Sequence, residues 1–316
     1  MPLFNANQMI KEMRKIKGLT QEKLAEGICS RSTINMIEQG KRKPDWYTFK
    51  SLMDRLGVDV GNYFSDTASE NEAELYSLLY SLRRLRTLDK FDELKTEIEK
   101  MNTNEKFKEG LGYRVYRECC GFFYSAGPYA DLPLALKYTM EILEETRPGF
   151  DVEEMQNYFL SDNERAAVGR LINIYGETGE TEKAIRLRYK LIENYEKNNT
   201  PMGLLVRGNY CTQIANLAYR LNEAGRYEEC LEATEKGMKT AANDIATTEV
   251  YMRILYFKAC ALLFLNQKEE GNALYKRYIH YAHAMGENQS PDFSVEFLKK
   301  NYEKSFGGKL ELFLPW

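Results

Sequence analysis

The sequence has few of the residues that metal sites and catalytic sites use. Its 316 residues include two histidines, His280 and His283, and two imidazoles supply at most half of a metal site. The six cysteines have no metal-ligand spacing, which favours buried, reduced thiols over a redox switch. A Gly-x-Ser-x-Gly motif, a phosphate loop and a dinucleotide fingerprint are also lacking. We therefore expect no enzyme activity, no metal and no cofactor.

Long apolar runs are missing as well. No stretch reaches the roughly 18 apolar residues that a membrane-spanning helix needs, and the N-terminus lacks the apolar core of a secretory signal. We expect a cytoplasmic protein that does not enter a membrane.

An alternating strand pattern is absent from residues 73–306. Apolar stripes at helical spacing occur there in pairs, separated by turns that contain Gly, Asn or Asp. The length of the chain leaves room for one small domain and one larger one. The pattern predicts an all-α fold with an array of helix hairpins after residue 73.

Positive charge is concentrated in the first part of the chain. Residues 1–64 hold 11 Lys and Arg against 7 Asp and Glu, a net charge of +4, whereas the remainder holds 33 against 40, a net charge of −7. Only the N-terminal part is therefore suited to a phosphate backbone. A surplus of this size is weak evidence alone, but it coincides with a motif.

The motif, residues 20–43, predicts two short helices joined by a tight turn. Thr20 is placed to cap a helix that runs to about Glu26, and Gly27 ends that helix. Ser30 is placed to cap a second helix, in which Ile34 and Ile37 face inward. The second helix presents small polar side chains outward, which is typical of a recognition helix that reads the major groove of DNA.

Two sets of residues are candidates for DNA contact. For the groove we predict Gln21, Arg31, Ser32, Thr33 and Asn35, and for backbone phosphate Lys41, Arg42 and Lys43. The alternatives are that Gln21 only supplies polarity at a helix start and that the basic run is a solvated loop. Position within the motif favours contact for both.

Residues 7–64 resemble the Xre-type helix-turn-helix domain. The first helix and its glycine exit match at residues 10–21, the fourth helix at Phe49, Leu52, Met53 and Leu56, and the fifth at residues 56–64. The resemblance implies a five-helix DNA-binding domain. The short turn Gly27-Ile28-Cys29-Ser30 is similar to that of the Rgg, PlcR and PrgX (RRNPP) regulators, which respond to peptide pheromones. Membership would imply that a tetratricopeptide-like domain follows and binds a short signalling peptide in quorum sensing.

The hairpins after residue 73 align on a small residue near the start of each second helix. These residues are Ala135, Ala184, Cys230 and Gly271. Their spacings of 49, 46 and 41 residues exceed the ~34 of an ideal tetratricopeptide repeat, so either the helices or the loops are longer. An earlier turn at 89–91 and a final helix from Phe293 to Phe306 complete about five hairpins in a right-handed superhelix.

Stacked helix pairs form a concave surface lined by the first helix of each pair, and a concave surface suits a ligand. Arg, Asn and Tyr at inward positions can hold a carboxylate, peptide backbone groups and apolar side chains. The predicted peptide-binding residues are Arg117, Tyr124, Arg170, Asn173, Asn209, Thr212, Asn216, Tyr219, Asn222, Arg253 and Tyr256. Each is singly an ordinary surface residue, and the resemblance strengthens the set, since pheromone-binding relatives use inward Asn residues in this way. The aromatic residues around 256–281 are expected to be mostly core.

The combined prediction is a peptide-responsive transcription regulator. It assigns residues 1–64 to DNA binding, 65–72 to a linker, and 73–316 to peptide binding and dimerisation. A homodimer would place two recognition helices about 34 Å apart on double-stranded DNA, and peptide would change their spacing. Two alternatives remain: the array is a protein-interaction scaffold, or it sequesters or dephosphorylates a partner protein.

Overall fold

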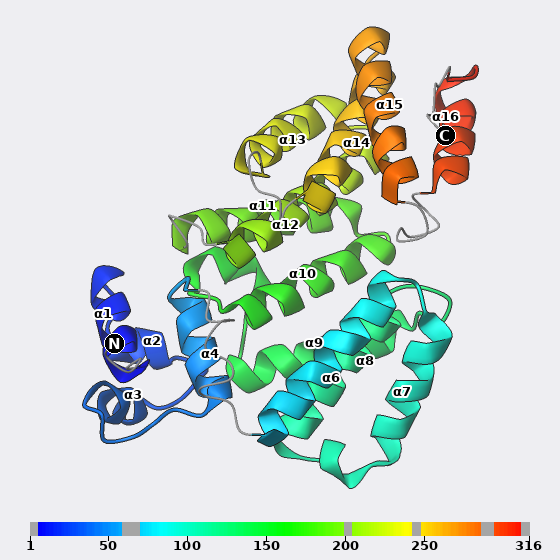
Figure 1. The fold of residues 1–316 in the computed structure, drawn as a ribbon. Helices are drawn as coiled ribbons and strands as arrows, with labels where there is room; N and C mark the ends of the chain where they lie inside the picture. The colour runs from blue at the N-terminus through cyan, green and yellow to red at the C-terminus, as the bar shows by residue number, and fades with distance from the viewer. Residues whose placement is uncertain (1–5, 59–69, 199–203, 242–247, 286–293, 311–316) are drawn as a thin grey trace.

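The computed structural model describes residues 6–58, 70–198, 204–241, 248–285 and 294–310. Within these ranges the regular elements are helices and no strand occurs, as predicted. Figure 1 shows a curved array of helix pairs, with the N-terminal helices packed beside its middle. None of the described helices is both long and apolar enough to cross a membrane.

The N-terminal helices form a small unit, residues 6–58, that we call the headpiece. Its helices are α1 (Ala6–Ile16), α2 (Gln21–Ala25), α3 (Arg31–Glu38) and α4 (Trp46–Arg55). They enclose a core of fully buried side chains, among them Ile10, Leu24, Ile34, Phe49 and Leu52. The predicted second, third and fourth helices are confirmed. The predicted fifth helix falls mostly on residues 59–69, which lie outside the described residues.

Side-chain caps set the helix starts of the headpiece. The backbone N–H of Lys23 donates to Thr20 Oγ1 (3.1 Å), and the N–H of Thr33 donates to Ser30 Oγ (3.1 Å). Asp45 caps α4 in the same way, through the N–H of Thr48 (2.7 Å). These bonds satisfy backbone donors that a helix start leaves unpaired, and they confirm both caps predicted for the motif.

After the headpiece, the described residues form five helix pairs and a final helix, which we call the repeat array. The pairs are α6 (Glu70–Thr87) with α7 (Phe91–Thr103), α8 (Gly110–Tyr124) with α9 (Leu132–Thr146), α10 (Asp162–Glu177) with α11 (Thr181–Asn198), α12 (Leu204–Glu223) with α13 (Tyr227–Ala241), and α14 (Thr248–Phe264) with α15 (Lys268–Met285). The last helix is α16 (Val295–Phe306), capped by Ser294. The predicted five hairpins and capping helix are confirmed. Helix α6 begins inside the segment expected to be a linker, since the acidic side chains of Glu70 and Glu72 stabilise a helix N-terminus.

The aligned small residues lie where the two helices of a pair approach each other. Ala135, Ala184 and Cys230 are each at most 1% exposed. A Cβ on Gly271 would lie 2.8 Å from Leu263 Cγ, so a larger residue would force α14 and α15 apart. This confirms the alignment of the hairpins.

Extra structure and longer helices account for the wide spacing of the repeats. The chain between α9 and α10 forms a short 3-10 helix, η3 (Val152–Asn157), and another, η2 (Glu105–Phe107), precedes α8. Asn194 Nδ2 fastens η3 to α11 by donating to the carbonyls of Met155 (2.8 Å) and Tyr158 (2.7 Å). Helices α11 and α12 are 18 and 20 residues long. The wide repeat spacing therefore comes both from longer helices and from longer connections between them.

The cysteines and aromatic residues fit the core interpretation. Five of the six cysteines are buried, Cys29 is half-buried, and none forms a disulfide. Tyr275 and Tyr278 are buried against Tyr256, with ring centroids 5.5 and 5.0 Å from it. His280 and His283 are exposed on α15. Among the described residues no three His, Cys, Asp or Glu side chains form a possible metal-binding group.

Candidate functional site

The outer face of α3 carries the predicted groove-contacting residues. Arg31, Ser32 and Asn35 are exposed and Thr33 is half-buried, while Ile34 and Ile37 on the other face are fully buried. The hydroxyl groups of Ser32 and Thr33 lie 2.7 and 2.9 Å from Ser30 Oγ, which orders the first turn. The polar end of α3 is therefore a preorganised, solvent-facing surface.

Gln21 lies beside this surface and contacts a buried ion pair. Its Nε2 donates to Glu38 Oε2 (2.9 Å), and Arg14 Nη2 donates to the same oxygen (2.9 Å). Burial alone would raise the pKa of Glu38, but the hydrogen bonds from Arg14 and Gln21 outweigh it and lower the pKa. Glu38 thus stays ionised and joins α1 and α2 to the end of α3. Sequence reasoning missed Arg14 and Glu38, which are 24 residues apart in the chain.

The basic run follows α3 directly. Lys41, Arg42 and Lys43 are exposed, and the turn at Gly40 (φ 71°) directs the chain out of the helix. The N–H of Lys41 donates to the carbonyl of Met36 (2.9 Å), which closes the helix end. The three cations therefore stand next to the outer face of α3, where they can approach a phosphate backbone.

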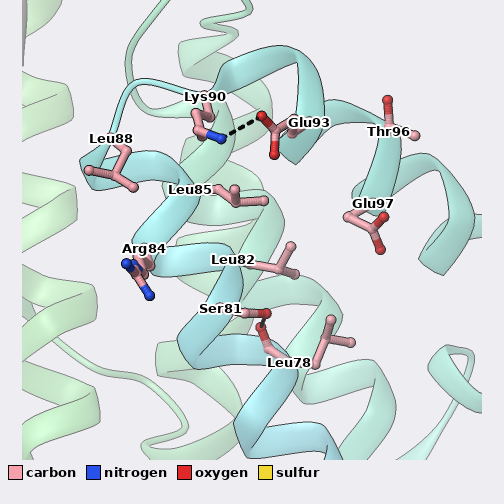
Figure 2. Close-up of a pocket in the computed structure, with 10 residues that line it drawn as sticks. All are labelled: Leu78, Ser81, Leu82, Arg84, Leu85, Leu88, Lys90, Glu93, Thr96 and Glu97. Carbon is pink, nitrogen blue, oxygen red and sulfur yellow. Dashed lines mark hydrogen bonds and ion pairs between the residues drawn. The ribbon is translucent and has the colours of Figure 1, made fainter. Parts of the chain in front are cut away.

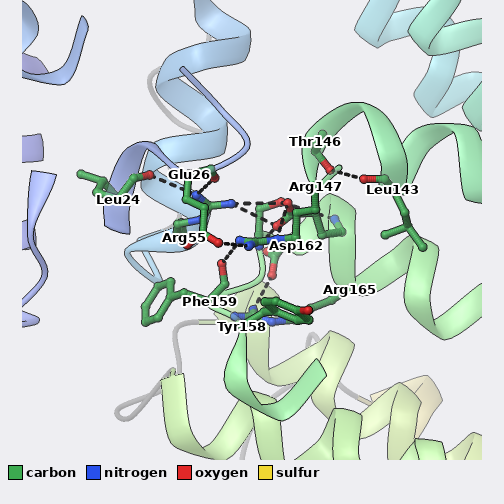
Figure 3. Close-up of polar contacts among 12 residues, drawn as sticks. Leu24, Glu26, Arg55, Leu143, Thr146, Arg147, Tyr158, Phe159, Asp162 and Arg165 are labelled. Atoms are coloured by element: carbon green, nitrogen blue, oxygen red, sulfur yellow. Dashed lines mark hydrogen bonds and ion pairs between the residues drawn. The ribbon is translucent and has the colours of Figure 1, made fainter. Parts of the chain in front are cut away.

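A buried polar network, which we call the junction, joins the headpiece to the repeat array (Figure 3). Arg55 of α4 is fully buried, and its guanidinium donates to the carbonyls of Leu24 (3.1 Å) and Glu26 at the end of α2. Its Nη2 lies 3.2 Å from Glu164 Oε2 in the first turn of α10. Arg147, after α9, lies 3.0 Å from both Glu164 and Glu26. One carboxylate of the array therefore holds two arginines that contact the end of α2.

Glu164 is fixed by its own helix as well. Its side chain accepts from the N–H of Ser161 (2.6 Å), and Ser161 Oγ accepts from the N–H of Glu164 (3.3 Å), which forms a capping box at the start of α10. Burial lowers the pKa of Arg55 more than the charge of Glu164 raises it. The guanidinium of Arg55 therefore depends on this carboxylate, because a buried cation is costly without a partner.

The headpiece and the array also touch at Gly27. A Cβ on this glycine (φ 71°) would lie 1.7 Å from the carbonyl oxygen of Thr146, so only glycine permits the observed approach. A cavity of about 760 Å³ opens nearby between α4 and α8, and Tyr47, Arg114 and Arg117 are among its lining residues. The structure thus places predicted residue Arg117 at the cavity beside the headpiece, where its guanidinium pairs with Glu145.

The first helices of the third, fourth and fifth pairs carry a set of polar side chains that we call the inner row: Arg170 and Asn173 of α10, Asn216 of α12 and Arg253 of α14. Arg170 Nη2 lies 2.8 Å from Glu118 of α8, and Arg253 Nη2 donates to Asn216 Oδ1 (3.4 Å). Asn173 Oδ1 accepts from Arg188, a buried residue of α11. Hydrogen bonds and ion pairs therefore join neighbouring helices along the row.

The other predicted ligand residues differ in exposure. Asn209 and Tyr219 are exposed, whereas Tyr124, Thr212 and Asn222 are half-buried. Asn222 Nδ2 donates to the carbonyl of Phe257 (3.0 Å), which ties α12 to α14. Tyr256 is only 7% exposed and accepts from Asn301 Nδ2 (2.9 Å), because its ring packs among the aromatic side chains of α15. Tyr256 therefore lies in the core of the array and offers little surface to a ligand.

Two buried arginines near the inner row, Arg188 and Arg220, were missed by sequence reasoning, whereas Arg170 was predicted. A Cβ on Gly121 would lie 2.6 Å from Arg170 Nη1, one on Gly169 3.5 Å from Arg188 Nη1, and one on Gly176 2.6 Å from Arg220 Nε. Gly121 and Gly176 therefore make room for a guanidinium, whereas a Cβ on Gly169 would make only ordinary contact with Arg188. Isolated glycines inside helices were the available signal, since they usually have a packing reason.

A second hollow lies away from the inner row. It is an open groove of about 590 Å³ between α6 and α7, lined by Leu78, Leu82, Leu85 and Leu88 together with polar residues (Figure 2). Its polar lining residues include Arg84, Lys90 and Glu93, and Asn is not among the residues that line it. The Asn side chains that can pair with a peptide backbone are therefore on the inner row.

Comparisons with known proteins agree with this arrangement. Residues 10–61 match the helix-turn-helix family model HTH_3. An HTH-type transcriptional regulator of Bacillus subtilis, YqaF, whose name calls it uncharacterized, is 36% identical over 64 residues, which are 20% of this chain and 84% of YqaF. The crystal structure of Bacillus thuringiensis PlcR in complex with the peptide PapR7 and DNA aligns with a TM-score of 0.56 and 19% identity, over 90% of this chain and 96% of PlcR.

The pheromone receptor Rgg2 of Streptococcus dysgalactiae aligns over 95% of this chain and 99% of its own, with a TM-score of 0.49 and 13% identity. The PlcR alignment spans both the headpiece and the array, so the whole architecture is a known fold. From the match to YqaF and the matching domain model, the chain belongs to the helix-turn-helix family of transcriptional regulators.

Proposed function

We propose that this regulator is a cytoplasmic receptor for a short signalling peptide. The peptide would bind across the inner row and change how the regulator binds its promoter. PlcR, whose fold is similar over 90% of this chain, was crystallised with both a peptide and DNA. The role is one of binding, and it requires no catalytic group.

Helix α10 is the main support for the proposal, because it contributes residues both to the junction with the headpiece and to the inner row. Glu164 in its first turn holds Arg55 of the headpiece, and Asn173 further along the same helix belongs to the inner row. The two residues are nine positions apart on the helix, which corresponds to about 14 Å at 1.5 Å per residue. A rigid helix of this length would transmit a shift at the inner row directly to the end of α2.

The same residues define the proposed DNA complex. Arg31, Ser32, Thr33 and Asn35 would contact base edges, with Gln21 at the margin, and Lys41, Arg42 and Lys43 would contact phosphate. Two copies paired through their repeat arrays would set two α3 helices at successive major grooves about 34 Å apart. Peptide binding would then alter this spacing. In this proposal the DNA-binding domain comprises residues 1–64, of which the headpiece is the described part, and the repeat array begins near residue 70.

A binding experiment tests both parts of the proposal. Fluorescence anisotropy would measure the affinity of the full chain for the DNA upstream of its gene, with and without synthetic peptides of five to ten residues. Arg31→Ala and Asn35→Ala should each weaken specific binding by about 1–3 kcal/mol. The exposed residue Arg186 on α11 supplies a control, because Arg186→Ala removes a cation from the repeat array, where it pairs with Glu153 of η3.

The outcomes separate the two claims. Loss of affinity in the α3 variants with no peptide response in any variant would reject the peptide receptor and leave a regulator with a scaffold array. Equal affinity of the native chain for promoter and random DNA at moderate salt would reject the assignment of α3.

A further inference from the structure

Arg188 of α11 is a buried cation that has no acidic partner in the part of the chain that the structure describes. Its side chain is 2% exposed, and its guanidinium donates to three neutral acceptors: the carbonyl of Gly169 (3.3 Å), Asn173 Oδ1 and Gln213 Oε1. Its Nε is buried without a hydrogen-bond partner. Burial, and next the charge of Arg220, lower the pKa of this guanidinium below its usual range. The site therefore holds positive charge that no neighbour neutralises.

The other buried arginines of the described chain do not share this property. Each of them lies within ion-pair distance of at least one carboxylate: Arg55 and Arg147 with Glu164, Arg117 with Glu145, Arg165 with Asp162, Arg170 with Glu118, and Arg220 with Glu177 and Glu223. Buried charges are normally paired in this way. Arg188 is thus the exception among the buried arginines of the described residues, because no described carboxylate lies within ion-pair distance of it.

The unpaired cation lies directly behind the inner row. Its guanidinium lies between α10 and α12, since it donates to the carbonyl of Gly169 and to Gln213 Oε1, and the residue Asn173, which accepts from Nη2, is exposed. Further along the inner row, Arg253 of α14 also donates to an amide, that of Asn216, and no carboxylate of the described residues lies within ion-pair distance of it. An anion that replaced the Asn173 oxygen would bring a negative charge to a cation that only neutral acceptors now hold.

We infer that Arg188 and Asn173 form a carboxylate-binding subsite on the inner face of the array, so that the ligand must bring a carboxylate to this point. The planar guanidinium matches a carboxylate, which can accept two parallel N–H bonds. The carboxylate could be the C-terminus of a peptide or an acidic side chain within it. This inference rests on the proposed function, and it adds the chemical class that the receptor selects.

Binding of defined peptide pools to the full chain tests the inference. Three random heptapeptide pools would be captured and quantified by mass spectrometry: neutral peptides with a free C-terminal carboxylate, C-terminally amidated peptides with one Glu, and amidated neutral peptides. At least one of the first two pools should be enriched about tenfold over the third, as expected for one charge-assisted contact. The pool that is enriched identifies the source of the carboxylate.

Variants of one helix separate this contact from general charge. Arg188→Gln should abolish the enrichment and Arg188→Lys should retain part of it. Arg186→Gln is the matched control, because it removes the same charge from the exposed side of α11 and should leave the enrichment unchanged. Circular dichroism would establish that each variant is folded. Equal capture of the three pools by the native chain, or full enrichment in Arg188→Gln, would overturn the subsite.

A second measurement does not depend on peptides. Acetate, compared with chloride at equal ionic strength, should raise the melting temperature of the native chain and of Arg186→Gln more than that of Arg188→Gln. An acetate effect of this kind without any peptide capture would reject the peptide receptor and support the subsite. An acetate effect equal in all three proteins, or absent from all three, would overturn the subsite even if peptides bind.

Discussion

Replacing Glu164 by Gln should uncouple the headpiece from the repeat array. The change keeps the shape of the side chain and an oxygen that can accept from the N–H of Ser161, so α10 keeps its cap. It removes the one carboxylate that faces both Arg55 and Arg147. Arg55 is 0% exposed and Arg147 is 5% exposed. Without the carboxylate of Glu164, Arg55 would be held by backbone carbonyls and Arg147 would keep its ion pair with Glu26.

The expected loss is large because the charges are buried. Breaking one buried pair costs about 3–5 kcal/mol, chiefly because it leaves an unpaired charge in the interior. The control is Glu153→Gln in η3, whose side chain is 38% exposed and pairs with Arg186 (2.6 Å) and Lys190 (3.1 Å). Exposed pairs are worth at most about 1 kcal/mol, so this variant should resemble the native chain.

Hydrogen exchange is the most direct assay, because it reports on each helix separately. In Glu164→Gln the amides of α4 and of the first turn of α10 should exchange faster, while those of α14 and α15 should keep their native rates. Urea denaturation would give the total loss of stability. DNA affinity should persist, but peptide should no longer change it. If Glu164→Gln and the control Glu153→Gln show the same amide exchange rates in α4 and the same stability in urea, the junction does not hold the headpiece.

Two other predictions concern the same contact region. Burial raises the pKa of Asp54 to about 6, so in the folded state this acid is easier to protonate than in the unfolded state, and its ionisation destabilises the fold as pH rises from about 4 to about 6. Asp54→Asn should therefore stabilise the chain at pH 7 by up to about 3 kcal/mol, with the gain vanishing near pH 4, and a pH series of urea midpoints that shows a constant or reversed difference would contradict this. Gly27→Ala should destabilise the chain by more than Gly149→Ala. Both glycines have φ near 70°, but only a Cβ at position 27 would meet backbone, 1.7 Å from the Thr146 oxygen. Thermal unfolding of the two variants gives the comparison, and equal losses of stability would show that the contact at Gly27 adds nothing.

The local structure of this chain could be predicted well from its sequence. Thr20 and Ser30 cap the helices they were expected to cap, and Ala135, Ala184 and Cys230 are buried at the helix crossings. Caps, glycine turns and apolar periodicity act within a few residues, so a single sequence reveals them. The groove-contacting residues remain predictions, with the exposure of α3 in their favour.

The long-range polar contacts could not be predicted in this way. Arg55 and Glu164 are 109 residues apart, and no local pattern indicates that they meet. Arg188 and Arg186 lie two positions apart on one helix, and only the packing of α10 and α12 decides that the first is buried and the second exposed. Tyr256 was predicted to face a ligand from the first helix of its pair. Its ring is instead covered by the aromatic side chains of Tyr275 and Tyr278.

The contact between Arg55 and the carbonyls at the end of α2 has a consequence for engineering hybrid regulators. Arg55 holds the end of α2, just before the turn that leads to α3, and its charge is balanced by Glu164 of the array. The DNA-binding unit therefore depends on a residue that lies outside its own helices. A chimaera that fuses residues 1–64 to a foreign sensor would leave Arg55 facing a surface without its acid. Transplanting the sensor end together with Arg147, Ser161 and Glu164 would preserve the interlocking surfaces, and with them the ability of one module to instruct the other.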